Sequence, residues 1–116
     1  MAKEECLFCK IISGEISAPP VYEDEQVVVI RDISPQAPHH FLVLPREHIV
    51  SALDLEERHD ALVGHVFRVA ARLAREQGFA ESGFRIVNNC GRDGGQTVGH
   101  IHFHLLGGRS LEWPPG

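Results

Sequence analysis

The stretch His-Ile-His-Phe-His-Leu-Leu at residues 100–106 places three histidines in alternation with apolar residues. Successive side chains of an extended strand point to opposite faces, so this pattern predicts a strand with three imidazoles on one face and an apolar core on the other. A strand that needed only a solvated face would normally use Thr, Lys or Glu there, because imidazole titrates near neutrality and favours strands poorly. The stretch therefore predicts that the three histidines on this face of the strand serve a function.

The composition limits where the protein works and what it binds. The chain has 116 residues, 43% of them hydrophobic, which predicts a single domain over residues 1–116. The formal charge of −5, with Lys and Arg scattered along the chain, argues against a nucleic-acid partner. Residues 1–5 carry no apolar signal core, and no apolar run approaches the roughly 18 residues that cross a bilayer. We therefore expect a cytoplasmic protein with no membrane segment.

The chain has three cysteines, an odd number that a disulfide framework would not use cleanly. Cys6 and Cys9 form a C-x-x-C pair, which in a reducing compartment more often binds metal. The alternative is that both are small buried apolar residues on a short helix. Cys90 has no partner in the sequence pattern and is expected to be a free thiol.

Apolar periodicity and turn residues predict the secondary structure. A short helix begins after Cys6 and stops near Ser13-Gly14, and a long helix runs from an N-cap at Asp54 to Gln77-Gly78. The predicted strands cover residues 21–23, 27–30, 41–44, 84–89 and 101–106, and a loop covers residues 90–99. Strands that follow mostly in hairpin order, with one long helix inserted, predict an α+β domain with an antiparallel sheet rather than a doubly wound one.

Two kinds of chemistry use alternating histidines on a strand. In one, two histidines and a third ligand hold a catalytic zinc with an open water position. In the other, one imidazole attacks an electrophile directly. The preceding loop carries Gly91, Gly94, Gly95 and Gly99, whose backbone N–H groups can converge on phosphate oxygens. Since Gln96 and Thr97 add neutral hydrogen-bonding groups directly before the histidines, attack on phosphorus is the better interpretation.

The segment from Gln96 to Leu106 resembles the Q-x-x-x-H-φ-H-φ-H-φ-φ signature of the histidine triad (HIT) superfamily of nucleotide hydrolases and transferases. Further matches lie at residues 6–12, 32–38, 44–48 and 93–96, and so cover nearly the whole chain. The closing residues 106–109 and 113–116 resemble the Hint branch, the purine nucleoside phosphoramidases. The fragile-histidine branch usually has proline where this chain has Gly107, and the uridylyltransferase branch has glutamine in place of His104.

The resemblance implies a HIT-like fold: an antiparallel sheet of about five strands with one long and one short helix, assembled as a homodimer. It implies hydrolysis of the P–N bond of purine nucleoside 5'-phosphoramidates (AMP-amines, with aminoacyl-AMP as a further substrate class), through a covalent nucleotidyl-histidine, with release of AMP or GMP. Three alternatives stay open. They are a dinucleoside polyphosphate hydrolase, a zinc hydrolase that uses the histidine strand itself, and a purine nucleotide-binding module without catalysis.

The resemblance also assigns roles to individual residues. His102 would be the nucleophile, with its second ring nitrogen donating to a backbone carbonyl near His100, and His104 would face the phosphate and the departing group. Asp32 would accept from both ribose hydroxyls, although a turn-capping aspartate is the alternative. The remaining substrate contacts implied are Gln96, Thr97, Asn89 and Gly95 at the phosphate, Ile33, Phe8, Ile11 and Ile30 at the base, and Trp113 from the partner copy. For Phe8, Ile11 and Ile30 a place in the plain core is an equally good interpretation.

The same resemblance implies a structural zinc ion, because many bacterial members join a C-x-x-C pair to two histidines. The matching residues are Cys6, Cys9, His48 and His100, which would saturate the ion and leave no water position. In that case His100 supports the site and does no catalysis. His40 is expected to pack, and His59 and His65 are expected to be solvated on the long helix.

Overall fold

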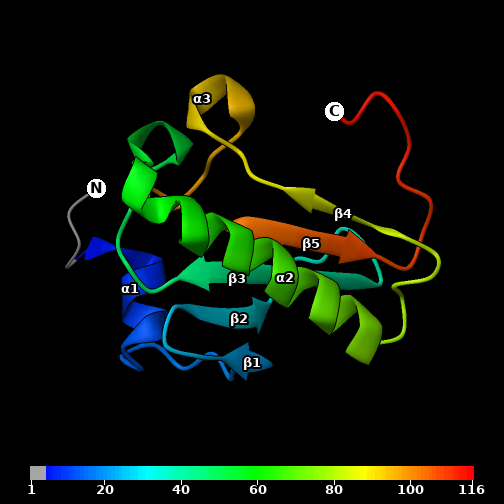
Figure 1. Cartoon of the computed structure of the whole chain (residues 1–116), viewed down its shortest axis with the longest axis horizontal. Coiled ribbons are helices and arrows are strands. Elements are labelled where there is room, and N and C mark those ends of the chain that lie inside the picture. Colours follow the sequence, from blue (N-terminus) through cyan, green and yellow to red (C-terminus); the bar gives the residue numbers. More distant parts are fainter. Residues whose placement is uncertain (1–4) are drawn as a thin grey trace.

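The structure, a computed structural model that describes residues 5–116, contains one five-stranded antiparallel sheet in the order β1-β2-β3-β5-β4 (Figure 1). Its strands are β1 (Tyr22–Glu23), β2 (Val27–Arg31), β3 (His39–Pro45), β4 (Phe84–Val87) and β5 (Phe103–Gly107), and its helices are α1 (Leu7–Ile12), α2 (Asp60–Glu76) and the single turn α3 (Gly91–Gly94). The predicted α+β class, with about five antiparallel strands, one long helix and one short one, is confirmed. The expectation that the N-terminus carries no signal segment concerns residues 1–5, and residues 1–4 lie outside the described residues.

Helix α2 covers one face of the sheet (Figure 1). Its apolar stripe recurs at helical spacing, as the sequence predicts, and packs against inward-facing residues of the central strands. No helix within residues 5–116 combines the length and the apolar character needed to cross a membrane. The buried residues of this core include Val66, Val69, Ala70 and Leu73 of α2 and Phe41, Val43, Phe103 and Leu105 of the sheet.

Helix α1 packs on the opposite face of the sheet. Phe8 and Cys6 contact residues of β2 and β3 that alternate with those of the first core, namely Val28, Ile30, Leu42 and Leu44. The helix ends at the C-cap Ser13, and Gly14 adopts a positive φ of 85° that favours glycine. Strand β5, which carries His104, therefore lies between β3 and the edge strand β4 in a sheet that has a helix on each face.

The predicted start of the long helix at Asp54 is wrong, because α2 begins at Asp60. Asp54 does belong to a capping box, but it is the third residue of a short 3-10 turn, η2 (Ala52–Asp54), and its carboxylate accepts from the backbone N–H of Ser51. The extended ψ of 138° at Leu55 then interrupts the chain before a second 3-10 turn, η3 (Glu57–His59). Asp54 therefore helps to cap a shorter element that begins after Ser51, and it is not the N-cap that the sequence predicted.

The expectation that His59 and His65 are solvated is also wrong. His59 is only 3% exposed, its Nδ1 accepts from the Glu56 N–H, and its Nε2 donates to a Glu47 carboxylate oxygen at 3.0 Å. His65 is partly buried, with Nε2 at 2.6 Å from a carboxylate oxygen of Asp24. Each imidazole therefore pairs with a carboxylate in a loop beside a strand, since Asp24 lies between β1 and β2 and Glu47 follows β3.

Strands β4 and β5 are shorter or shifted relative to the prediction. Residues 100–102 precede the β5 ladder, with a bend at His100, and the Ile101 N–H donates outside the sheet, to the Ile49 carbonyl at 2.7 Å. The alternation survives this departure: Ile101, Phe103 and Leu105 are buried in the α2-side core, as predicted. Gly107, at the end of β5, lies so close to the Phe79 ring that an added Cβ would be 2.3 Å from it.

Candidate active site

His102 is a buried histidine whose ring is fixed by the backbone. Its Nδ1 lies 2.7 Å from the His100 carbonyl oxygen, an acceptor that holds the proton on Nδ1 and leaves the lone pair on Nε2. The Asn88 side chain donates to the His102 carbonyl at 2.9 Å, and the Phe8 ring meets the imidazole edge-on at 4.9 Å between centroids. The expected contact with the backbone near His100 is therefore present.

His104 is the last member of a hydrogen-bonded chain that starts at the backbone of Gln36. The Gln36 N–H donates to His40 Nδ1 at 3.0 Å, which places the proton of neutral His40 on Nε2. His40 Nε2 lies 2.9 Å from His104 Nδ1 and 3.4 Å from an Asp32 carboxylate oxygen. Neutral His104 then carries its own proton on Nε2. His40 therefore orients His104, beyond the packing role expected for it.

The imidazoles of His40 and His104 are both held neutral at ordinary pH. Burial, and then the neighbouring His102 and His40, lower the pKa of His104 to about 4. Burial also lowers the pKa of His40, against the opposing attraction of Asp32. Although Asp32, His40 and His104 are close enough to hold a metal ion, a protonated His40 Nε2 offers no lone pair. The spacing suits a hydrogen-bond chain better than a ligand set.

Cys6, Cys9, His48 and His100 converge on one point beside His102, and we call these four residues the Cys–His cluster. His48 Nδ1 and His100 Nδ1 are 3.2 Å apart, and the sulfur-to-nitrogen distances run from 3.3 to 3.5 Å. A tetrahedral zinc ion with ordinary bond lengths separates two nitrogens by about 3.3 Å and a nitrogen from a sulfur by about 3.6 Å. The four side chains therefore fit a closed zinc site.

The tautomer of His100 supports the same assignment. Its Nε2 lies 2.8 Å from the Pro45 carbonyl, which fixes the proton there and turns the Nδ1 lone pair toward the cluster. His100 is fully buried, and Cys6 is as well. Burial lowers the pKa of His100, so its ring stays neutral, the form that binds metal.

A cleft of about 440 Å³ opens beside His102, on the α1 side of the sheet. Its walls are mostly apolar, with Asp32 the one carboxylate and Arg31 the one cation among the lining residues. The predicted site residues that line it are Phe8, Ile11, Ile30, Asp32, Ile33, Thr97 and His102. Ile33 is completely exposed at the rim, whereas Phe8 and Ile30 are also part of the α1-side core. Both interpretations offered for those two residues are thus compatible with their positions.

Four further predicted substrate contacts do not line the cleft: Gln96, Gly95, Asn89 and Trp113. The Gln96 side chain holds its own loop, since it donates to the Val50 and Val98 carbonyls and accepts from the Gly91 N–H. Gly95 ends the turn α3 with a positive φ of 81°. Asn89 is part of the segment between β4 and α3, and Trp113 is 82% exposed in the C-terminal segment. These positions leave the expected roles of Asn89, Gly95 and Trp113 as predictions.

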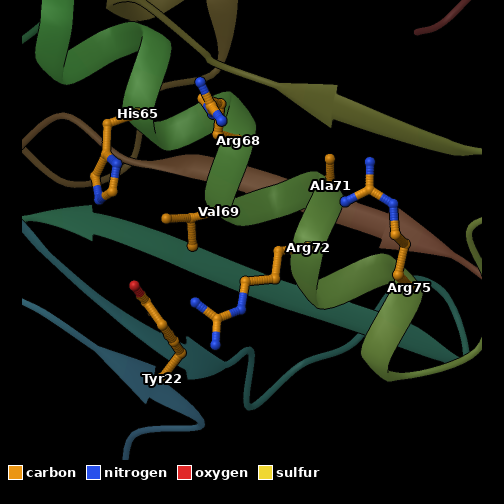
Figure 2. Close-up of a pocket in the computed structure, with 7 residues that line it drawn as sticks. All are labelled: Tyr22, His65, Arg68, Val69, Ala71, Arg72 and Arg75. Atoms are coloured by element: carbon orange, nitrogen blue, oxygen red, sulfur yellow. The ribbon is translucent and has the colours of Figure 1, made fainter.

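A larger hollow, of about 550 Å³, lies on the other face of the sheet between α2 and β1 (Figure 2). Arg68, Arg72 and Arg75 line it together with His65 and Tyr22, and Arg72 reaches over the Tyr22 ring at 5.3 Å. None of the predicted site residues lines this hollow. Since its arginines are carried by an exposed helix surface, we name it the arginine groove and treat it as separate from the histidine cleft.

Two residues of the site were missed or undervalued in the sequence. Asn88 was placed inside a strand, yet its amide supports the backbone of His102. His40 was given a packing role, yet it orients His104. The sequence signal for His40 was its match to a family position, two residues beyond the matched segment 32–38. For Asn88 the signal was an amide within a predicted strand, a residue type that strands disfavour.

Comparisons with known proteins agree with this geometry. The HIT domain family matches residues 13–111. The chain is 48% identical over 108 residues to the purine nucleoside phosphoramidase of Escherichia coli, covering 93% of this chain and 91% of that protein. A HIT family hydrolase from Legionella pneumophila superposes with a TM-score of 0.94 at 48% identity, covering 96% and 99% of the two chains. A Zn-bound histidine triad family protein from Mycobacterium smegmatis gives 0.80 at 36% identity, covering 97% and 81%.

Proposed function

The chain belongs to the HIT domain family of hydrolases, and from that premise we propose that it cleaves the P–N bond of purine nucleoside 5'-phosphoramidates and releases AMP or GMP. One observation carries the proposal. His102 has its Nδ1 proton committed to the His100 carbonyl, so its Nε2 lone pair is the free nucleophile of a residue that lines a nucleotide-sized cleft. The similarity to the Escherichia coli phosphoramidase supports the P–N bond as the target.

The reaction proceeds by two displacements at phosphorus. His102 Nε2 forms a bond to phosphorus as the P–N bond to the amine breaks, and the amine takes up a proton. Water then attacks phosphorus, the bond to His102 breaks, and the proton lost by water balances the one taken up. A neutral imidazole suits both steps, because it attacks near pH 7 and leaves readily from phosphorus.

The surrounding residues bind and orient the substrate. The apolar walls at Phe8, Ile11 and Ile30 take the planar base, and the Asp32 carboxylate accepts from the ribose hydroxyls. Thr97, at the cleft, donates to the phosphate. His104 is held neutral, with its Nε2 proton set by His40, and donates a hydrogen bond toward the departing group.

The Cys–His cluster would hold a zinc ion outside the chemistry. Two thiolates and two imidazoles saturate zinc, so the bound ion supplies a cross-link between α1 and the sheet rather than an activated water. The Zn-bound neighbour from Mycobacterium smegmatis supports this assignment.

The active unit is proposed to be a homodimer. Strand β4 is an edge of the sheet and carries the exposed Phe84, and two further exposed aromatic side chains are Phe67 on α2 and Trp113 in the C-terminal segment. In a dimer, the Trp113 segment would reach the partner's cleft, as the family resemblance implies. Light scattering after size exclusion tests this: a mass of one chain at micromolar concentration would reject the dimer.

The test of the function is capture of the intermediate. Protein mixed with adenosine 5'-phosphoramidate and quenched at neutral pH is expected to release amine and to carry an adenylyl adduct on the peptide that contains His102, seen by mass spectrometry. His65→Gln, a histidine change on α2 away from the cleft, is the matched control and keeps both signals. His102→Ala loses both.

Two outcomes contradict the proposal. Amine release by His102→Ala at the wild-type rate would reject His102 as the nucleophile. Binding of AMP without any amine release by the zinc-loaded wild-type protein would favour a nucleotide-binding module instead.

A further inference from the structure

The first turn of α1 contributes residues both to the Cys–His cluster and to the histidine cleft. Cys6 and Cys9 flank Leu7 and Phe8 in the sequence, and both of these apolar residues line the cleft. The Phe8 ring meets two imidazoles edge-on, at 5.9 Å from His100 and 4.9 Å from His102 between centroids. A metal ion that fixes the two thiolates therefore also fixes a wall of the cleft.

His100 connects the two sites a second time. Its ring nitrogen Nδ1 lies 3.3 Å from Cys6 Sγ, and its carbonyl oxygen accepts from His102 Nδ1 at 2.7 Å. The residue is fully buried, with its Nε2 held by the Pro45 carbonyl, so its ring and carbonyl have little freedom to move independently. A shift of the His100 ring away from the cluster would move the acceptor that sets the tautomer of His102.

We propose that metal binding in the Cys–His cluster positions the catalytic histidine and the cleft wall, by holding the His100 carbonyl and Phe8 against His102. The inference rests on the proposed function for its ligand, a purine nucleotide, and adds control of that same site by metal occupancy. Cys6, Cys9 and His100 are positioning residues here. The contrasting possibility is a clip that stabilises the fold and leaves the cleft of the folded protein unchanged.

Positioning of this kind makes metal and nucleotide affinities depend on each other. If zinc raises the affinity for AMP by some factor, AMP must raise the affinity for zinc by the same factor. We expect a factor of about ten, within the range of ordinary coupling between two sites. If the metal only stabilises the fold, zinc leaves the affinity of the folded protein for AMP unchanged, and the factor is one.

The experiment measures zinc affinity of the full-length, zinc-loaded protein against a competing chelator, with and without saturating AMP. The zinc dissociation constant is expected to fall about tenfold when AMP is present. A parallel titration without protein corrects for the weak binding of zinc by AMP itself. Calorimetry of AMP binding to the apo and loaded protein should return the same factor, at a temperature at which circular dichroism shows the apo protein folded.

A variant separates positioning from folding, even where the apo protein unfolds. Phe8→Leu keeps all four ligands but removes the ring that contacts His100 and His102. Its zinc affinity without AMP should stay within about twofold of wild type, while the effect of AMP on that affinity shrinks toward one. Lys10→Ala is the matched control on the same helix, outside the cluster and the cleft.

A spectroscopic readout follows the tautomer directly. Nitrogen-15 NMR of the loaded protein should show the His102 proton on Nδ1 alone, and metal removal from the folded protein should give a mixture of ring tautomers. Unchanged His102 signals in the folded apo protein, or equal zinc affinity with and without AMP, would overturn the inference. A protein that couples AMP to zinc but releases no amine from the phosphoramidate keeps this inference and rejects the proposed function.

Discussion

The arginine groove and the histidine cleft lie on opposite faces of one sheet and differ in what surrounds them. The arginine groove is the larger, at about 550 Å³, but its cations belong to an exposed helix surface. The histidine cleft is smaller, at about 440 Å³, yet its imidazole is fixed by a backbone carbonyl and adjoins two further clusters of histidines. This contrast indicates that hydrogen bonds that fix a side chain are a better guide to a candidate active site than the volume of a hollow is.

The largest effect is expected from removal of the proposed nucleophile. His102→Ala should lower kcat for adenosine 5'-phosphoramidate by about 10⁴-fold or more, because a covalent mechanism loses its attacking atom. Steady-state amine release measures the effect, with circular dichroism to show that the variant is folded. A loss of less than about 10-fold would place the chemistry elsewhere.

The opposite face of the same strand should respond in stability rather than in rate. Leu105 is fully buried in the α2-side core, so Leu105→Ala should lower the free energy of unfolding by about 2–5 kcal/mol. Urea unfolding measures this loss. At a temperature at which the variant is folded, kcat should stay within a few-fold of wild type. A large fall in kcat of the folded variant would show that the two faces are not independent.

The buried histidine chain should make stability depend on pH in a definite direction. His104 has a pKa near 4 when folded and about 6.5 when unfolded, so between these values the unfolded chain binds a proton that the folded chain does not. Stability should therefore fall as the pH drops from 6.5 toward 4. With its partial exposure discounted, His104 should contribute roughly 1 kcal/mol, or about 4–8 °C in Tm.

Thermal unfolding at pH 7 and pH 5 tests this, with His104→Asn as the comparison. The variant should lose less Tm between the two pH values than wild type does, and it keeps the contribution of His40, whose pKa is lowered as well. An NMR titration that found His104 protonating near pH 6.5 would contradict the prediction.

The smallest effect is expected in the larger hollow. Arg68→Ala with Arg75→Ala removes two of its cations, neither of which forms an ion pair with any residue in the range 5–116. Turnover should change by less than about twofold, and the unfolding free energy by less than about 0.5 kcal/mol. A tenfold change in kcat would mean that the arginine groove takes part in the reaction.

The sequence predicted the parts of the fold that follow from periodicity. The alternation at residues 100–106 correctly placed Ile101, Phe103 and Leu105 in the core, and the helical spacing correctly identified the buried stripe of α2. The predicted start of α2 was wrong because Asp54 is the third residue of a capping box whose N-cap is Ser51, and the backbone turns extended at Leu55 after one 3-10 turn. Side-chain periodicity could be recognised in the sequence, but tertiary packing set the length of α2.

The candidate site shows the same division. The convergence of Cys6, Cys9, His48 and His100 was anticipated through the family resemblance, because motif spacing carries over between relatives. The burial of His59 was not, since its partner Glu47 is 12 positions away in the sequence and comes into reach only in the folded chain. The contact between His40 and His104 was not predicted either, because the two residues are 64 positions apart and meet only when β3 pairs with β5, where Leu42 is the register partner of His104.

One close contact bears on how this sequence can diverge. A side chain at position 107 would occupy the space of the Phe79 ring, since even a Cβ would be 2.3 Å from it. Phe79 is itself buried and stacks on His39 at 4.4 Å between centroids. Any descendant that replaces Gly107 must therefore shrink residue 79 as well, and an alignment of its relatives should show the two positions changing together as one inherited unit.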